Sequence, residues 1–238
     1  MGSFLATLTM RWPAGESVVA GRSRCDGCER TLAWFELVPL LSFVVLRGRC
    51  RRCGAAIDWI HPTTELAAGV IGALAFLVAP LAQGLAGAMF GWILLALAIL
   101  DFRHLWLPDP LTLPLVLLGL GVSALPGGVT PLASAIGAGA GFLTLYAIGL
   151  LYRVTRGRDG LGGGDAKLLA AIGAWLGWYL LPLVLLLASV AGLAAVAVSA
   201  ARGNRISASD RLPLGTLLAI AAWPLWLARA PLTAYMGL

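Results

Sequence analysis

The chain has 238 residues, of which 60% are hydrophobic and only 12% are charged. Soluble domains carry about 25% charged residues, so the composition excludes an ordinary soluble protein and indicates an all-α, polytopic membrane helix bundle. The net charge of +6 would suggest nucleic-acid binding in a soluble protein, but in a membrane protein the positions of the positive residues matter more than their sum. We therefore expect no nucleic-acid partner.

The chain opens on a short apolar run, residues 2–10, which ends at Arg11. A membrane-spanning helix needs about 20 apolar residues, so this run is too short to cross a bilayer. It has neither a basic leader nor a clear small-residue cleavage site, and we expect no cleavable signal peptide.

Residues 11–61 form the only sizeable polar segment and contain all four cysteines of the chain. These form two CxxC pairs, Cys25 with Cys28 and Cys50 with Cys53, separated by 21 residues. This is the spacing of a zinc ribbon, in which two knuckles present four thiolates to one tetrahedral ion. Because four cysteine ligands leave no open position, we expect a structural Zn²⁺.

A redox pair, or two disulfides if the segment were exported, are the competing interpretations of these cysteines. Arginines surround them, at positions 11, 22, 24, 30, 47, 49, 51 and 52. The many arginines indicate that this segment lies at the cytoplasmic face of the membrane, where thiols stay reduced. This favours the zinc-ribbon-like module over disulfides.

The segment between the two cysteine pairs, residues 31–46, is apolar but interrupted by Glu36 and Pro39. We expect an amphipathic hairpin that lies against the membrane interface, not a span. Trp34 and Trp59 suit that depth, because tryptophan is enriched at membrane interfaces.

Seven apolar runs follow, and we expect about seven transmembrane helices in residues 66–238, after an N-terminal cytoplasmic module of residues 1–65. The runs are at approximately 66–79, 85–100, 111–124, 131–152, 166–178, 183–201 and 213–228. Of the 17 lysines and arginines, 16 fall on one side of the alternating linkers, and Arg229 is the exception. The positive-inside rule therefore places the cysteine pairs, Asp101 and Asp165 on the cytoplasmic side.

Glycine and alanine are abundant in two of these runs, at residues 133–141 and 170–177. Small residues let membrane helices approach one another closely. We expect tight helix contacts at both stretches.

Two aspartates at the cytoplasmic ends of different runs carry the functional hypothesis. Asp101 ends one run, and Asp165 follows the glycines 162–164 and begins another. Ionisable groups at membrane helices are costly and hence functional candidates, and the glycines allow close backbone approach. Two close carboxylates would share one proton, so the pair could activate a water as in an aspartic protease.

Each acid also has a structural interpretation. Asp165 could cap the helix that follows it, and Asp109, which precedes Pro110, could cap the next run. An ion-coupled membrane transporter could use Asp101 and Asp165 as ion sites, although both lie at one face and not near the midplane. A zinc-stabilised membrane scaffold would use the cysteines and leave the two acidic motifs without purpose.

Together the motifs resemble those of the bacterial type IV prepilin peptidases, which are membrane aspartic peptidases of the GxGD type. Gly162-Gly163-Gly164-Asp165 fits GxGD, and Ala166-Lys167-Leu168 continues the family pattern. Residues 101–109 resemble the first aspartate motif of the family. The CxxC pairs and residues 46–50 and 62–66 resemble its N-terminal cytoplasmic module.

The resemblance implies that Asp101 and Asp165 are the catalytic pair, with Gly162 and Gly164 supporting the motif. The implied reaction removes the basic leader from type IV prepilins or type II secretion pseudopilins at the cytoplasmic face of the bacterial inner membrane, so substrates and membrane lipid are the expected partners. Many members also methylate the new N-terminal amine with S-adenosylmethionine. Residues 2–5 look like the tail of the family's first transmembrane helix, which leaves seven runs where eight are expected and leaves open whether this chain methylates.

Overall fold

The computed structural model describes residues 1–17, 23–25, 27–157, 160–203 and 212–237. In these ranges the regular elements are helices, with two isolated β-bridges besides, and the all-α prediction is confirmed. The chain divides into two compact units, Met1–Leu74 and Ala75–Leu238. Five residues that the motif and charge predictions used lie outside the described residues: Arg22, Asp26, Arg158, Arg205 and Arg211.

One carboxylate joins three segments of the first unit. This unit contains α1 (Gly2–Arg11), the 3-10 helix η1 (Trp34–Leu37), α2 (Leu41–Val45) and the start of α3 (Ile60–Val78). On α3, Glu65 accepts hydrogen bonds from the hydroxyl of Ser3 and, at 2.9 Å, from the backbone N–H of Leu40. A Cβ on Gly2 would lie 2.5 Å from the Cα of Glu65, so α1 packs directly on α3.

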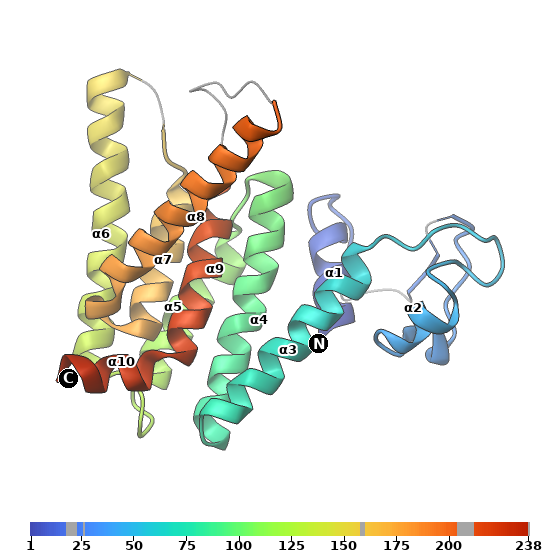
Figure 1. Cartoon of the computed structure of the whole chain (residues 1–238), viewed down its shortest axis with the longest axis horizontal. Coiled ribbons are helices and arrows are strands. Elements are labelled where there is room, and N and C mark those ends of the chain that lie inside the picture. Colours follow the sequence, from blue (N-terminus) through green and yellow to red (C-terminus); the bar gives the residue numbers. More distant parts are fainter. Residues whose placement is uncertain (18–22, 26, 158–159, 204–211, 238) are drawn as a thin grey trace. The chain divides into compact units, whose positions relative to one another are not determined.

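The seven predicted apolar runs correspond to the seven helices α3 to α9 (Figure 1). After α3 come α4 (Leu81–His104), α5 (Asp109–Val122), α6 (Pro131–Arg156), α7 (Gly163–Leu176), η2 (Trp178–Leu180), α8 (Leu181–Ala201), α9 (Leu214–Leu227) and α10 (Arg229–Met236).

Among the described residues, four helices are long and apolar enough to cross a membrane. They are α3, α4, α6 and the segment Trp178–Ala201, and α9 with α10 makes a fifth if their 72° bend lies within one span. The helices α5, α7 and α9 have 14 residues each, fewer than the roughly 20 of an ideal span. The chain is thus an integral membrane protein whose bundle combines long and short helices.

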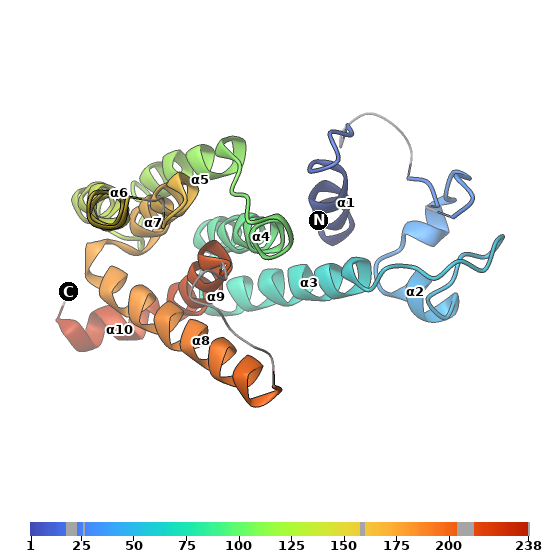
Figure 2. The same cartoon turned by 90° about the horizontal axis from the view of Figure 1, so that it is seen from above.

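The short helix α7 is the centre of the second unit. Its residues from Leu168 to Leu176 are all buried, and it packs against α5, α6 and α9 (Figure 2). The Trp175 ring stacks on Phe90 of α4 at 4.7 Å, and its indole N–H donates to the carbonyl of Leu115 on α5 at 2.9 Å. Such complete cover is typical of a helix that is apolar all round and lies in the core of a bundle.

The contact between α6 and α7 is made by small residues, as the sequence predicted. A Cβ on Gly137 would lie 2.3 Å from the carbonyl oxygen of Gly173, and a Cβ on Gly173 would lie 2.1 Å from that of Gly137. Beside this pair, the Ser134 hydroxyl donates to the carbonyl of Ala174 at 2.6 Å. The two backbones therefore touch, which only glycine allows at these positions.

We predict that Gly173→Ala destabilises the bundle by about 1–3 kcal/mol, because the added methyl group meets backbone atoms that no side-chain rotation can move. Gly139→Ala is the matched control: it is also on α6, and a Cβ there has nothing within 4 Å. That variant should be neutral or more stable by up to about 1 kcal/mol, the helix-propensity gain over glycine. Thermal unfolding in detergent, followed by tryptophan fluorescence, measures both, and equal melting temperatures would contradict the packing argument.

Candidate active site

Asp101 lies in the last turn of α4 and is almost fully buried, with 5% of its surface exposed. Its Oδ2 accepts a hydrogen bond from the backbone N–H of Thr216, in the first turn of α9, at 2.7 Å. The Thr216 hydroxyl lies 3.2 Å from the same oxygen and 2.9 Å from the carbonyl oxygen of Ala98. The end of α4 and the start of α9 are thereby held together.

This contact satisfies a general need of helix N-termini. The first N–H groups of a helix have no partner within it, and its dipole places partial positive charge there. On α9, no side chain caps the N-terminus from within the helix. The carboxylate of Asp101 takes that role from a different helix, which is a favourable location for a negative charge.

Asp165 is the third residue of α7 and is half-buried. Of the three glycines before it, two have no room for a Cβ without close contacts, and one has open space. A Cβ on Gly162 would lie 3.2 Å from the Asp165 Oδ2, and a Cβ on Gly164 would lie 2.8 Å from the Cβ of Leu107, whereas Gly163 has nothing within 4 Å. The structure therefore gives a steric reason for glycine at Gly162 and Gly164 and none at Gly163, which matches the pattern GxGD.

The structure brings the two predicted aspartates together. Asp101 is close enough to Asp165 for their charges to interact. A Cβ on Gly215 would lie 3.1 Å from the Asp101 Cγ and 2.8 Å from the Cδ1 of Leu107, and a Cβ on Gly164 would also meet Leu107. The ends of three helices, α4, α7 and α9, thus meet at the two carboxylates.

Gly215 and Thr216 were missed by the sequence analysis. The sequence holds only a weak indication of their role: Gly215 lies two residues after Pro213, at the start of the last long apolar run. It lies on the same side of the alternating linkers as Asp101 and Asp165. Backbone donors carry no side-chain chemistry, so only the fold reveals that these two residues face the carboxylates.

Asp109 belongs to an ion pair and not to the pair of aspartates. Both oxygens of its carboxylate accept hydrogen bonds from the Lys167 ammonium, at 2.6 and 2.8 Å. Asp109 is the first residue of α5, and the cap position before it is Pro108, with no side-chain capping bond. The capping interpretation of Asp109 is therefore replaced by a link between α5 and α7.

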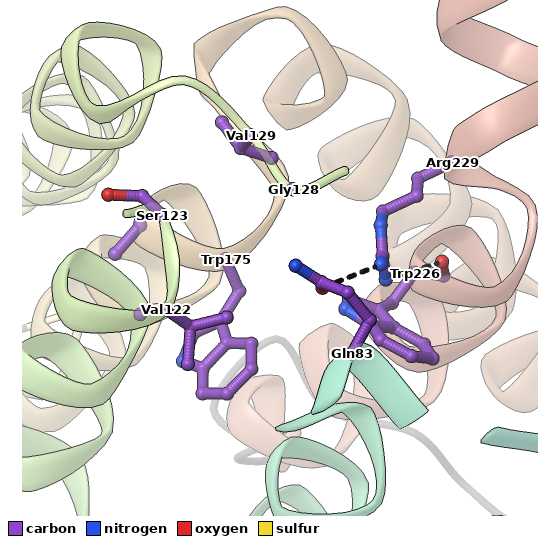
Figure 3. Close-up of a pocket in the computed structure, with 10 residues that line it drawn as sticks. Gln83, Val122, Ser123, Gly128, Val129, Trp175, Trp226 and Arg229 are labelled. Carbon is purple, nitrogen blue, oxygen red and sulfur yellow. Dashed lines mark hydrogen bonds between the residues drawn. The ribbon is translucent and has the colours of Figure 1, made fainter. Parts of the chain in front are cut away.

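A second polar cluster lines a small cavity near the start of α4, whereas Asp101 lies near the end of that helix. Figure 3 shows its side chains. The Arg229 guanidinium donates to Gln83 at 3.0 Å and lies 3.9 Å from the centre of the Trp226 ring, while the Gln83 amide donates to the carbonyl of Pro126 at 3.1 Å. The cavity beside it measures about 10 Å³, room for about one water. Arg229, the exception to the charge pattern, is thus a structural residue that ties α10 to α4.

The four cysteines of the first unit converge on one point. Their Sγ atoms lie within 4.8 Å of one another, all four thiols are free, and the Cys25 and Cys53 sulfurs are 3.8 Å apart. A tetrahedral zinc with Zn–S bonds of about 2.3 Å would place its sulfurs roughly 3.8 Å apart. The cysteines can therefore hold a metal ion.

An ion pair supports the backbone next to the first cysteine pair. The Arg30 guanidinium donates twice to Glu36, one bond measuring 2.9 Å, and the backbone N–H of Ala33 donates to Glu36 at 2.9 Å. The Arg30 bond, followed by the Ala33 bond, holds the pKa of Glu36 below its usual range. Glu36 interrupts an apolar segment because its carboxylate anchors the first knuckle to η1.

Comparison with known proteins gives matches to both parts of the chain. Residues 1–79 match the Bacterial Peptidase A24 N-terminal domain, and residues 88–197 match the Type IV leader peptidase family. No solved structure matches.

Several curated relatives carry the name Prepilin leader peptidase/N-methyltransferase. The one from Burkholderia pseudomallei (strain 1026b) is 46% identical over 211 residues, covering 87% of this chain and 67% of the relative. The one from Aeromonas hydrophila is 41% identical over 208 residues, covering 87% and 71%. The one from Klebsiella pneumoniae is 43% identical over 198 residues, covering 80% and 86%. The resemblance drawn from the motifs is confirmed.

We predict that the purified chain carries about one metal ion, because four thiolates at these distances complete one tetrahedron. Cys53→Ser should lower the metal content severalfold, since a hydroxyl is a poor ligand for zinc. Arg52→Gln is the control, because it alters the same knuckle but keeps the backbone N–H that faces Cys50. Elemental analysis by mass spectrometry measures both, and full metal content in Cys53→Ser would contradict a four-cysteine site.

Proposed function

This chain belongs to the Type IV leader peptidase family, and we propose that it cleaves the basic leader from type IV prepilins or type II secretion pseudopilins with Asp101 and Asp165. Its family makes it a peptidase, which sets aside the transporter and scaffold interpretations. One observation carries the assignment of residues: two carboxylates from helices far apart in the sequence lie close enough for their charges to interact, beside the N-terminus of α9.

The environments of the two carboxylates suggest different roles. Asp101 receives the Thr216 backbone N–H on Oδ2, and a hydrogen bond to a carboxylate stabilises its negative charge. Asp101 then acts as the base that removes a proton from water, whose oxygen attacks the scissile carbonyl carbon. Asp165 holds a proton and gives it to the carbonyl oxygen. As the C–N bond breaks, the proton on Asp101 passes to the leaving nitrogen, and a hydroxyl of the tetrahedral intermediate returns its proton to Asp165 as the C=O bond re-forms.

The proposed substrate fits the membrane placement of this pair. A prepilin offers an apolar helix that lies in the bilayer and a basic leader outside it, so its cleavage point lies at the depth of the helix ends. The charge pattern supports an inner-membrane location with Asp101 and Asp165 facing the cytoplasm. It also supports two functional parts, a cytoplasmic module of residues 1–65 and a membrane peptidase domain of residues 66–238, and it gives no reason to expect nucleic acid.

Two ligands complete the proposal. The cysteine cluster would hold Zn²⁺ as a structural ion, which ties the two knuckles and supplies no open position for chemistry. The relatives' names include N-methyltransferase, and S-adenosylmethionine would be the methyl donor if this chain has that activity. Membrane lipid is the remaining partner.

We predict that Asp101→Asn and Asp165→Asn each lower leader cleavage by roughly 10²- to 10⁴-fold or more, because an amide can neither accept the proton nor donate one as an acid. Asp109→Asn is the matched control. It removes a carboxylate at the same end of the helices but breaks only a solvent-accessible ion pair, worth about 0–1 kcal/mol. Cleavage of a co-expressed prepilin, at equal membrane abundance of all variants, is the measurement. Normal cleavage by either Asn variant at 101 or 165 would exclude the two-aspartate mechanism.

We also predict that Thr216→Val lowers kcat by roughly 10- to 100-fold and leaves KM unchanged, because the hydroxyl positions Asp101 and does not bind substrate. One hydrogen bond to a charged group is worth about 1.5–3 kcal/mol, and each 1.36 kcal/mol changes the rate about tenfold. Thr216→Ser keeps the hydroxyl and should restore kcat. Steady-state cleavage of a detergent-solubilised prepilin separates the two constants. If Val and Ser variants were equally slow, the hydroxyl would have no positioning role.

A further inference from the structure

The first unit has a hollow of about 410 Å³ between α2 and the second cysteine knuckle. Phe43, Arg47, Arg49, Ile57 and Trp59 line it, and we call it the arginine hollow. The Phe43 and Trp59 rings are in contact, with their centres 5.1 Å apart. Its size is that of a small-ligand site. The proposed peptidase reaction does not use the arginine hollow.

The two arginines of the hollow are exposed and available. Among the described residues, neither Arg47 nor Arg49 has an ion pair or a side-chain hydrogen bond, whereas Arg30 binds Glu36 and Arg51 lies over the Phe35 ring. Among the lining residues that the structure describes, none is acidic. Two guanidiniums that line one hollow without an acidic partner suit it to an anion that accepts from both.

The second cysteine knuckle, which contributes two of the metal-binding thiols, holds one wall of the hollow in place. The backbone N–H of Ile57 donates to Gly48 at 2.8 Å, and that of Cys50 donates to Ala55 at 2.8 Å. Arg47 itself has φ +52°, a backbone region that side-chain-bearing residues rarely adopt. The first arginine is therefore held in an uncommon conformation, and such conformations concentrate at functional sites.

Apolar side chains surround these charges and lie next to a membrane helix. Val44, Val45 and Trp59 have 69–70% of their surface exposed, a large apolar area for a water-facing loop. Trp59 directly precedes α3, which is one of the four helices able to span a membrane. The hollow is therefore joined directly, through Trp59, to a helix that can enter the bilayer.

We propose that the arginine hollow binds the phosphate headgroup of an anionic phospholipid in the bilayer that α3 enters, with Val44, Val45 and Trp59 in the interface. A lipid phosphate accepts from both guanidiniums, and its acyl chains meet the apolar side chains. S-adenosylmethionine fits less well, because its sulfonium cation would face two arginines and no carboxylate. A basic leader peptide would be repelled.

The test uses the full chain in nanodiscs of phosphatidylcholine, with or without 30% phosphatidylglycerol. Hydrogen–deuterium exchange is followed over residues 41–49. We expect phosphatidylglycerol to slow exchange there at least about fivefold, the effect of one arginine at an anionic surface. In Arg47→Gln/Arg49→Gln this slowing should disappear.

The matched control is Arg24→Gln/Arg52→Gln, which removes the same charge from the same unit outside the hollow, and it should keep the slowing. Metal content of each variant verifies that the knuckles remain intact. Equal slowing in the two double variants, or none in the unsubstituted chain, would overturn the proposal. It would also be overturned if inorganic phosphate or S-adenosylmethionine gave the same protection in pure phosphatidylcholine discs, because the hollow would then be a site for a soluble ligand.

Discussion

The backbone contact between α6 and α7 is the constraint on which the membrane unit depends. α7 has only 14 residues and carries Asp165 in its first turn, so its depth and rotation decide where that carboxylate lies. Gly137 and Gly173 allow the carbonyl of each helix to face the Cα of the other, and this leaves little freedom to slide. A short helix without such contacts could not place an acid reproducibly, because apolar burial alone is non-directional.

The aspartate site is built from helix ends and not from helix faces. Leu107, in the linker between α4 and α5, touches the positions where Gly164 and Gly215 would carry a Cβ, so one leucine sets how closely α7 and α9 approach α4. The N-terminus of α9 then offers its unpaired N–H groups to Asp101. Both acids thus lie where helix dipoles favour negative charge.

The N-terminal unit uses a different way to become stable. Its helices are short, and the apolar residues of α2 are largely exposed, so burial of a core contributes little. Polar links replace it: the cysteine cluster and the Glu65 carboxylate each join segments distant in sequence, and the Arg30–Glu36 pair adds a local link. A small unit commonly relies on such links, because it has too little apolar surface to bury. This also leaves apolar side chains free for the membrane.

The sequence by itself determined what composition and local pattern encode: an all-helical membrane protein, the seven apolar segments, four cysteines spaced to hold one metal ion, and the family. It also pointed to the two aspartates that we propose as the catalytic pair. These follow from burial energy, ligand spacing and motif, which are properties of neighbouring residues. Tertiary structure alone decided that Gly215 and Thr216 face Asp101, that Asp109 binds Lys167, that Arg229 is structural and that Arg47 and Arg49 share a hollow. These depend on which helix ends and turns meet, and backbone N–H groups, which every residue but proline carries, leave no mark in the sequence.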